Sequence, residues 1–541
     1  MSSIGHRLRS LATEHGRHPA LFYQDEELSF ADLAADARQI AEALARLGVS
    51  KGTRVGLLMP NQPDWLRCAF GAWRLGAIVV PINTLYRTAE LEHALRHADV
   101  TVLLMIARFL NNSYLESLAE LCPEVAVPEQ PLRCEALPCL RHVVCQGQTV
   151  PPGAIAWEDF LASGSPGQNA WVRAALDEVT ADDDAAIFFT SGSTAAPKGV
   201  VHTHAGMLQA ADNVADRLGL TAADRTYGYL PLFFNGGLVA VGLATLSKGG
   251  AVLLQDVFDP GSALRMMERH RCTTFFGWPH QAEALIHHPS FDARKLAVRK
   301  GPGANTKWAA KLFPSDHAAV GTWGMTETGP MATSTRHVDP LPVRCATHGR
   351  PMPGLELRIV DPETNEPLPA NVEGEIVVRG TSLMRTYYRQ ASRDCFDAEG
   401  YFHTGDCGRL DDTGNLHFIG RIKDVIKTAG VNVAAAEVEA VLMSHPAVKV
   451  AHVVPVPHPT RGENVAGFIV QRDPGCSEPD LVEYCRSRLA SYKVPRHLFF
   501  VPEQELPILG SGKVDRRKLR DLAAERAAAN APDDSSTEPA R

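Results

Sequence analysis

Alternating helix and strand patterns near the N-terminus constrain the fold of this chain most strongly. Apolar residues recur at helical spacing between Ser29, a residue type that caps helices, and Gly48, which favours a helix end. Residues 54–59 then read as a strand, 62–75 as a helix and 77–80 as a strand. Strands that alternate with helices favour parallel pairing. We therefore expect a layered α/β fold with largely parallel sheets.

The pattern changes twice along the chain, which predicts domain boundaries. After about residue 338, short strands separated by turn-rich sequence favour antiparallel β structure. We expect an N-terminal domain over 1–420, including a small β-barrel-like subdomain at about 338–420. A small α+β C-terminal domain over 421–529 and a disordered tail over 530–541 would follow.

Composition excludes some classes of protein. The 541 residues carry 54 Lys and Arg against 62 Asp and Glu, a net charge of −8, whereas nucleic-acid binders normally have a basic surplus. The longest apolar stretch, 236–254, contains Lys248, Gly249 and Gly250 and predicts a buried helix followed by a strand, not a membrane span. Arg and His interrupt the N-terminus, so we expect no secretory signal and a cytoplasmic protein.

Cysteine and histidine patterns do not predict a metal site. Eleven scattered cysteines without a CxxC pair favour reduced thiols. The four closest in sequence match no zinc spacing: Cys122, Cys134, Cys139 and Cys145. His202 and His204 form an HxH pair, which we expect to be part of the fold.

The segment from Thr190 to Gly199, TSGSTAAPKG, follows an apolar strand. Its hydroxyls, backbone N–H groups and Lys198 could bind an anion such as a triphosphate. It is not the Walker pattern, because Gly199 and not Ser or Thr follows the lysine. Taken alone, such a loop is more often an ordinary turn.

Further motifs follow in order: GTWGMTETG at 321–329, HTGD at 403–406, GRIKD at 420–424, KTAGVN at 427–432 and PILGSGK at 507–513. From about residue 20 to 520, the chain resembles the adenylate-forming superfamily of acyl- and aryl-CoA ligases, firefly-type luciferases and peptide-synthetase adenylation domains. The ATP site that this resemblance implies comprises Thr190, Ser191, Gly192, Ser193, Thr194, Lys198, Gly303, Ala304, Trp323, Gly324, Met325, Thr326, Asp406, Arg421 and Lys513.

The resemblance also implies catalytic roles for Thr326, Glu327 and Lys513. Glu327 matches the Mg²⁺ ligand of the family, and a carboxylate suits that hard cation. Lys513 would stabilise the charge that develops when a carboxylate attacks the α-phosphate. The C-terminal domain would act as a mobile lid that pivots at Lys423, and Gly430 would line the tunnel for the CoA thiol.

The resemblance implies an apolar acyl pocket formed by Phe234, Gly237, Trp278, Met325 and Met331. An α-amino acid substrate is disfavoured because residues 233–235 contain no acid that could pair with its amine. Fatty, aryl and alicyclic acids all remain compatible with this pocket. Three positions depart from the family pattern: Ala195 replaces a glycine of the phosphate loop, Phe234 stands where many relatives have His, and Ala435 stands where Pro is usual.

We therefore expect an acyl-CoA ligase that uses a carboxylic acid, ATP and CoA as substrates and Mg²⁺ as cofactor. An acyl-AMP ligase that loads a carrier protein is one alternative, although the insertion such enzymes often carry is not visible. A catalytically silent binding protein is another, supported only by Ala195. A luciferase-type monooxygenase shares the motifs, and a homodimer is left open.

Overall fold

A computed structural model describes residues 3–164, 170–190, 197–304, 306, 308–314, 316–422, 425–472, 475–507 and 514–529. The described residues form two compact units. Unit 1 comprises the residues up to Thr190 and Lys198–Ile422, and unit 2 comprises Pro197 and the described residues from 425 onward. The predicted tail over 530–541 lies outside the described residues.

Local sequence signals explain the first helices of unit 1. Helix α2 (Phe30–Arg46) begins at Ser29, whose hydroxyl accepts the Asp32 N–H, while the Asp32 carboxylate accepts the Ser29 N–H. Beyond its end, Gly48 has φ = +79°, a conformation that glycine adopts without strain. Helix α3 (Pro63–Arg74) begins with proline. Proline has no backbone N–H, and this costs no hydrogen bond because N–H groups in the first turn have no partner within the helix. These helices confirm the predicted alternation.

The larger sheet of unit 1 has eight strands in the order β20-β11-β10-β4-β3-β5-β8-β9. They are β3 (Arg54–Leu58), β4 (Ile78–Pro81), β5 (Val102–Ile106), β8 (His142–Gln146), β9 (Ile155–Ala156), β10 (Asp184–Thr190), β11 (Lys198–Thr203) and β20 (Thr386–Tyr387). Pairing is parallel from β10 through β9. Strand β11 is antiparallel to both β10 and β20, so it joins a late segment of the chain to this sheet.

The second sheet has five strands in the order β14-β12-β13-β1-β2. They are β1 (Pro19–Tyr23), β2 (Glu26–Ser29), β12 (Arg225–Gly228), β13 (Ala251–Leu254) and β14 (Thr274–Phe276). All pairs except β1–β2 are parallel. The predicted α/β class with largely parallel sheets is therefore confirmed.

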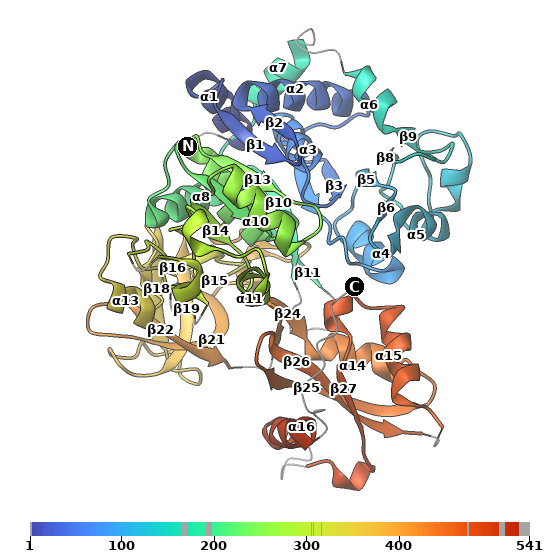
Figure 1. The fold of residues 1–541 in the computed structure, drawn as a ribbon. Coiled ribbons are helices and arrows are strands. Elements are labelled where there is room, and N and C mark those ends of the chain that lie inside the picture. Colours follow the sequence, from blue (N-terminus) through green and yellow to red (C-terminus); the bar gives the residue numbers. More distant parts are fainter. Residues whose placement is uncertain are drawn as a thin grey trace. The chain divides into compact units, whose positions relative to one another are not determined.

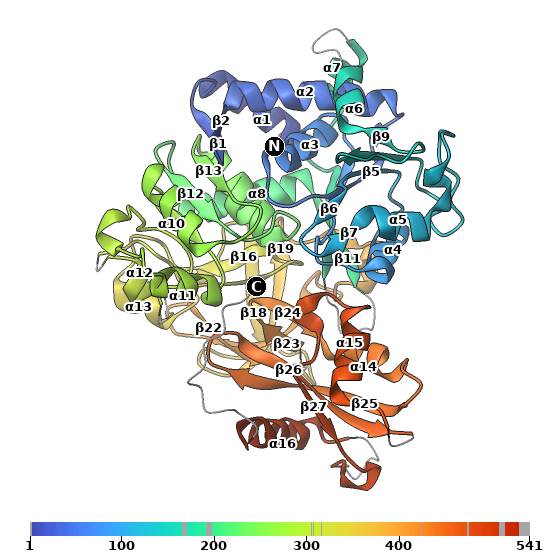
Figure 2. The same cartoon turned by 45° about the vertical axis from the view of Figure 1, so that its right-hand side comes forward.

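Alternation of side chains along the strands produces a layered core. Leu57 and Leu104 face a central helical layer, whereas Leu58 and Leu103 face the other side of the eight-stranded sheet. The central layer contains α1 (Ile4–Glu14), α2, α3, α8 (His204–Leu218), η2 (Gly236–Leu243, wound as a π-helix) and α9 (Ala244–Ser247). Outer helices are α4 (Thr88–His97) and α5 (Tyr114–Leu121) on one side, and α10 (Pro260–Arg269), α11 (Pro279–His287) and α12 (Ala309–Leu312) on the other (Figures 1 and 2).

The later part of unit 1 is antiparallel, as predicted. Strands β15 (Thr322–Met325), β16 (Gly329–Ser334) and β17 (Arg350–Pro351) form one small sheet. A four-stranded sheet consists of β18 (Leu355–Val360), β19 (Gly374–Gly380), β21 (Phe402–Leu410) and β22 (Leu416–Arg421). Smaller elements are β6 (Arg108–Phe109), β7 (Asn112–Ser113), α6 (Trp157–Ser163), α7 (Ala170–Asp177), α13 (Leu341–Ala346) and the short helices η1 (Pro123–Ala126), η3 (Ala293–Lys295) and η4 (Ser392–Asp394).

Unit 2 is a small α+β structure. Its sheet contains β23 (Val425–Thr428), β24 (Val431–Ala434), β25 (Val448–His458), β26 (Gly462–Gln471) and β27 (His497–Phe500). Helices α14 (Ala435–Met443) and α15 (Glu478–Arg486) cover one face and α16 (Arg516–Ala529) the other. Short helices η5 (Ser491–Lys493) and η6 (Glu503–Glu505) complete it, and a buried ion pair joins Lys493 Nζ to Glu437 Oε1 at 2.6 Å.

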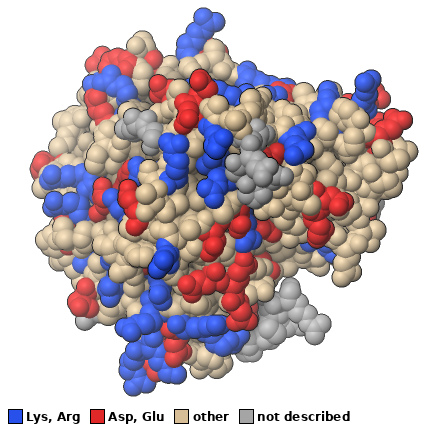
Figure 3. All heavy atoms as spheres, turned by 90° about the horizontal axis from the view of Figure 1, so that it is seen from above, with Lys and Arg blue, Asp and Glu red and all other residues tan. Residues whose placement is uncertain are grey.

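Several expectations from composition can be compared with the structure. All eleven cysteines are free thiols. Among the described residues, no helix is both long and apolar enough to cross a membrane. Acidic and basic side chains are interspersed over most of the face seen in Figure 3, as expected for a chain without a basic surplus.

Close contact between α2 and α3 leads to a stability prediction. A Cβ on Gly71 would lie 2.6 Å from Ile40 Cγ2 and 3.2 Å from the Ala37 carbonyl oxygen. We expect Gly71→Ala to destabilise the protein by about 1–3 kcal/mol, because overpacking outweighs the better helix propensity of alanine. The urea midpoint of the full chain measures this change. As a control, Gly242→Ala places its Cβ no closer than 3.6 Å to a neighbour and should not lower the midpoint; equal losses would contradict the packing argument.

Candidate functional site

The β15–β16 hairpin lies at the centre of the predicted site. Its turn contains Thr326, whose carbonyl oxygen accepts hydrogen bonds from two side chains. His202 Nε2, from β11, donates at 2.7 Å, and Asn235 Nδ2, directly before η2, donates at 3.1 Å. Because a carbonyl can only accept, the proton of His202 lies on Nε2. These two bonds hold the turn against both the large sheet and the central helical layer.

Glu327, the predicted Mg²⁺ ligand, is a buried carboxylate in the same turn. Its Oε1 accepts the hydroxyl proton of Tyr387 at 2.9 Å, and its carbonyl accepts the Met384 N–H at 2.7 Å. Lys198 Nζ lies 4.7 Å from the centre of the Tyr387 ring, a cation–π contact. The structure therefore brings the predicted phosphate-binding lysine and the predicted metal ligand to the same tyrosine.

Trp323 and Asp406, predicted to contact adenine and ribose, are hydrogen-bonded to each other. Trp323 Nε1 donates to Asp406 Oδ2 at 2.9 Å, and both residues are buried. Trp323 belongs to β15 and Asp406 to β21, so two separate sheets contribute to the pair. Asp406 also pairs in backbone register with Arg421 of β22. The two strands place the predicted nucleotide residues at neighbouring positions.

The remaining predicted ATP residues fall in different places. Thr190 and Lys198 are register partners at the ends of β10 and β11. The Gly303 and Ala304 N–H groups donate to the Val320 carbonyl. Gly324 must lack a side chain, because a Cβ there would lie 2.8 Å from the Pro330 carbonyl oxygen. Ser191, Gly192, Ser193, Thr194, Lys423 and Lys513 lie outside the described residues, as does Ala195.

Two of the residues predicted for the acyl pocket contact each other. The rings of Phe234 and Trp278 meet edge to face, with centroids 6.2 Å apart. Asn61 holds the segment before Phe234, because its Nδ2 donates to the Leu230 carbonyl and its Oδ1 accepts the Leu232 N–H. This segment is therefore fixed to the loop between β3 and α3.

Other predicted pocket residues have local packing roles. A Cβ on Gly237 would lie 2.1 Å from the Pro231 carbonyl oxygen, so the close approach of this loop requires glycine. Met331 is buried in the central core, whereas Met325 is only half-buried and lies beside the turn. Contact of Gly237, Met325 and Met331 with an acyl group stays a prediction.

In unit 2, Gly430 occupies the turn between β23 and β24 with φ = +81°. This left-handed conformation favours glycine independently of any tunnel. Its predicted role beside the CoA thiol stays a prediction.

The histidines of the HxH pair bond to different parts of unit 1. His202 contacts the Thr326 carbonyl, whereas His204 Nδ1 accepts the Ile4 N–H at 3.3 Å. Burial lowers the pKa of each side chain to about 4. The described residues show these histidines as neutral parts of the fold and do not bring them together as a metal site.

Sequence reasoning missed three residues that organise the site: Asn61, Asn235 and Tyr387. Each lies outside the matched motifs and acts through a contact with a distant segment. Asn235 is polar but buried. A polar residue within an apolar stretch was the one sequence signal that could have indicated its role. Tyr387 carries no comparable local signal.

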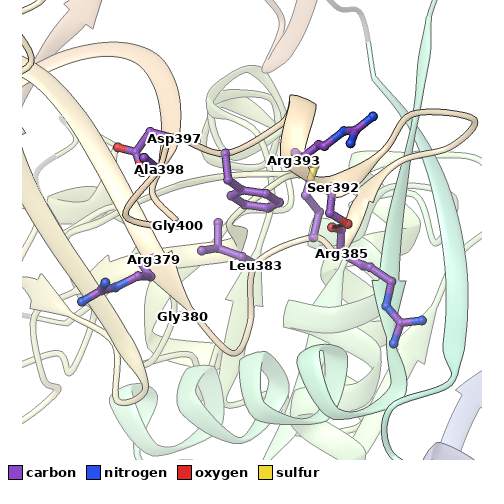
Figure 4. A pocket seen from close by; sticks show the side chains of 11 residues that line it. Arg379, Gly380, Leu383, Arg385, Ser392, Arg393, Asp397, Ala398 and Gly400 are labelled. Atoms are coloured by element: carbon purple, nitrogen blue, oxygen red, sulfur yellow. Dashed lines mark hydrogen bonds between the residues drawn. The ribbon is translucent and has the colours of Figure 1, made fainter.

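A pocket of about 610 Å³ lies beside the candidate site, and none of the predicted site residues lines it. In Figure 4, Leu383 points inward, whereas the guanidinium groups of Arg379, Arg385 and Arg393 point away from it. Arg379 pairs with Glu356, and Arg385 pairs with Asp184 at 2.8 Å. The positive groups therefore do not converge on the pocket.

Comparison with known proteins gives the family. Residues 8–388 match the AMP-binding enzymes, and residues 437–513 match the AMP-binding enzyme C-terminal domain. A relative from Mycobacterium tuberculosis is 33% identical over 93% of this chain and 96% of its own length. It is a 3-[(3aS,4S,7aS)-7a-methyl-1,5-dioxo-octahydro-1H-inden-4-yl]propanoyl:CoA ligase.

Two other proteins extend this comparison. A mitochondrial medium-chain acyl-CoA ligase of Danio rerio is 29% identical over 93% of this chain and 85% of its own length. The structure of o-succinylbenzoate CoA synthetase from Bacillus subtilis superposes with a TM-score of 0.78 at 26% identity, covering 95% of this chain and 98% of that one. The chain belongs to the adenylate-forming AMP-binding enzymes, in the family of AMP-forming acid–CoA ligases.

The low pKa of His202, the buried histidine beside Thr326, leads to a prediction about stability and pH. The pKa of His202 in the folded protein is about 4, against 6.5 for an unperturbed histidine. Between these values the unfolded chain takes up a proton that the folded chain does not, so stability falls as the pH falls from 6.5 to 4. His202 should contribute up to about 3 kcal/mol to this loss.

We expect His202→Gln, whose side-chain amide can still donate to Thr326, to flatten the dependence of the urea midpoint on pH. His204→Gln provides an independent comparison at a second buried histidine and should flatten it further when combined with His202→Gln. A variant with the same pH slope as the unmodified protein would contradict a neutral, buried His202.

Proposed function

We propose that this protein activates a carboxylic acid with ATP as acyl-AMP, releases pyrophosphate and then transfers the acyl group to CoA. The grouping around the β15–β16 hairpin is the main structural support. Trp323, Glu327 and Asp406 come from the positions at which the family binds a nucleotide, and side-chain hydrogen bonds fix all three. Membership in the acid–CoA ligase family supports ATP and CoA as co-substrates.

The nucleotide would contact residues that the fold holds at strand ends. Lys198 and the loop that contains Ser191, Gly192, Ser193 and Thr194 would bind the phosphates. Gly303, Ala304 and Trp323 would contact adenine, and Asp406 with Arg421 would contact ribose. Hydrogen bonding to Trp323 would keep the Asp406 carboxylate oriented for the sugar hydroxyls.

The residues present fit the magnesium ion that ATP chemistry implies. Glu327 is a buried carboxylate, and carboxylate oxygens are the hard ligands that magnesium prefers. Magnesium bound there would neutralise phosphate charge. Tyr387 would orient the carboxylate. The hydrogen bonds to the Thr326 carbonyl would hold this residue so that its side chain points toward the α-phosphate.

The proposed chemistry has two balanced steps. A carboxylate oxygen of the acid attacks the α-phosphorus, the bond to the β-phosphate oxygen breaks, and pyrophosphate leaves. Lys513 would offset the repulsion between the two anions in this step. The CoA sulfur then attacks the acyl carbon, AMP leaves and the thiol proton goes to solvent. We propose that the lid domain, 421–529, pivots at Lys423 between the steps and places Gly430 beside the thiol.

The acid that fits this proposal is apolar and not an α-amino acid. Phe234 and Trp278 provide two aromatic surfaces in contact, and Met325 and Met331 would extend the apolar lining. Asn235, the residue after Phe234, donates a side-chain N–H to the Thr326 carbonyl. The relatives include a ligase for an alicyclic acid, a medium-chain acyl-CoA ligase and a synthetase for an aryl acid, o-succinylbenzoate, so we propose these classes together. The proposal places the protein in the cytoplasm and assigns no role to a second copy of the chain.

A panel of carboxylic acids tests this proposal directly. We expect pyrophosphate release with Mg²⁺-ATP and an apolar fatty, aryl or alicyclic acid, and thioester formation only when CoA is added. The panel should include matched α-amino acids, which should not react. Pyrophosphate release without thioester formation would favour a carrier-protein acceptor. Absence of release with every acid would overturn the proposed activity.

The role of Lys513 can be tested by separating the two steps. We expect Lys513→Ala to reduce acid-dependent pyrophosphate release by at least about a hundredfold while leaving CoA transfer from supplied acyl-AMP largely intact. Lys518→Ala, at an exposed position of α16 in the same unit, is the matched control and should change neither step. Equal losses in both steps of the Lys513 variant would contradict a role restricted to adenylation.

A further inference from the structure

Two cysteines and a glutamate meet at the end of α5, in a part of unit 1 that the proposed reaction does not use. Cys122 follows the last residue of α5, Glu124 lies in η1, and Cys134 comes from the following loop. The two sulfurs and a carboxylate oxygen of Glu124 all lie within 4.8 Å of one another. Both cysteines are buried, whereas Glu124 is half-buried and gives the cluster an edge toward solvent.

Backbone contacts hold the Cys134 sulfur and the backbone of Cys122 in place. Cys134 Sγ donates to the Leu121 carbonyl at 3.0 Å and accepts the Leu137 N–H at 3.3 Å. The Cys122 N–H donates to the Leu118 carbonyl of α5. Both cysteines belong to the same apolar core as Leu118 and Leu137. The Cys134 sulfur is therefore positioned before any ligand arrives.

The carboxylate of the cluster also lacks a full set of partners. Glu124 Oε2 is buried and has no hydrogen-bond partner among the residues that the structure describes. An unpaired carboxylate oxygen in an apolar core is costly. A cation bound between the Glu124 carboxylate and the two nearby sulfurs would offset that cost.

We propose that Cys122, Glu124 and Cys134 form a binding site for one thiophilic divalent cation of the Zn²⁺ type. Two sulfurs and a carboxylate oxygen are ligands that zinc accepts, and the Leu121 carbonyl or a water molecule would complete four. Each thiol loses its proton to solvent as its sulfur binds the metal. The ion would tie the end of α5 to the loop around Cys134 and stabilise unit 1.

Spacing rules fail here because only two of the four cysteines that are closest in sequence, Cys122 and Cys134, supply ligands. Cys139 Sγ faces Asp99 Oδ1 at 3.4 Å, and Cys145 is buried in β8. Glu124 is the third proposed ligand. Its position in η1 brings its carboxylate close to the two sulfurs. The site is separate from Glu327, so its success or failure is independent of the proposed ligase reaction.

Titration with Co²⁺, a spectroscopic substitute for Zn²⁺, tests the site in the full-length, reduced and chelator-treated protein. We expect one equivalent of Co²⁺ to produce thiolate-to-metal absorbance and the strong visible bands of a tetrahedral site, and Zn²⁺ to displace it. Cys122→Ala and Cys134→Ala should abolish this signal. Glu124→Gln, at a half-buried position, should weaken binding by at least about tenfold. Cys139→Ala, in the same segment, should bind as the unmodified protein does.

Thermal unfolding provides a second measurement. Zn²⁺ should raise the unfolding midpoint of the unmodified protein and of Cys139→Ala, but not that of Cys134→Ala. The proposal is overturned if the unmodified protein shows no thiolate absorbance with Co²⁺. It is also overturned if Glu124→Gln and a Cys122→Ala/Cys134→Ala double variant both bind Co²⁺ as tightly as the unmodified protein does. A Cys122–Cys134 disulfide that persists under reducing conditions would also overturn it.

Discussion

The candidate site depends on the carbonyl oxygen of Thr326, which accepts hydrogen bonds from His202 and Asn235. These donors are 124 and 91 residues away in sequence and belong to different layers of unit 1. By binding one acceptor they fix the turn that carries Thr326 and Glu327. His202, the donor on β11, is buried, and burial lowers the pKa of its imidazole. The turn is therefore positioned by the core of the fold and not by its own short hairpin.

Segments from the later antiparallel part complete the arrangement around this turn. Tyr387 of β20 reaches Glu327 because β20 pairs with β11 at the edge of the large sheet. Asp406 of β21 reaches Trp323 from the four-stranded sheet. The net charge of −8 would not oppose the proposed polyphosphate binding, because local groups such as Lys198 would determine the potential there. The eight-stranded sheet and the central helical layer supply the side chains that contact the turn, and the four-stranded antiparallel sheet supplies the carboxylate that contacts Trp323.

Much of this architecture could be predicted from the sequence because its signals are local. The Ser29 cap, the proline that begins α3 and the apolar run of β10 each lie within the element they define. Ordered motifs likewise indicated the family and most candidate nucleotide residues. Tyr387 and Asn61 could not be found in this way, because their roles arise from strand pairing and loop contacts between distant segments. The same reason explains why spacing missed the grouping of Cys122 and Cys134.

By itself, the sequence determined the α/β class, the order of the elements, the family and the residue types available for ATP chemistry. These properties follow from periodicity, capping and motif order, which operate over a few to a few dozen residues. Only the tertiary structure decided which side chains meet: Tyr387 with Glu327, Trp323 with Asp406, and Glu124 with two cysteines. The physical reason is that a hydrogen bond or metal site requires positions accurate to a fraction of an ångström, and strand register and helix packing set those positions.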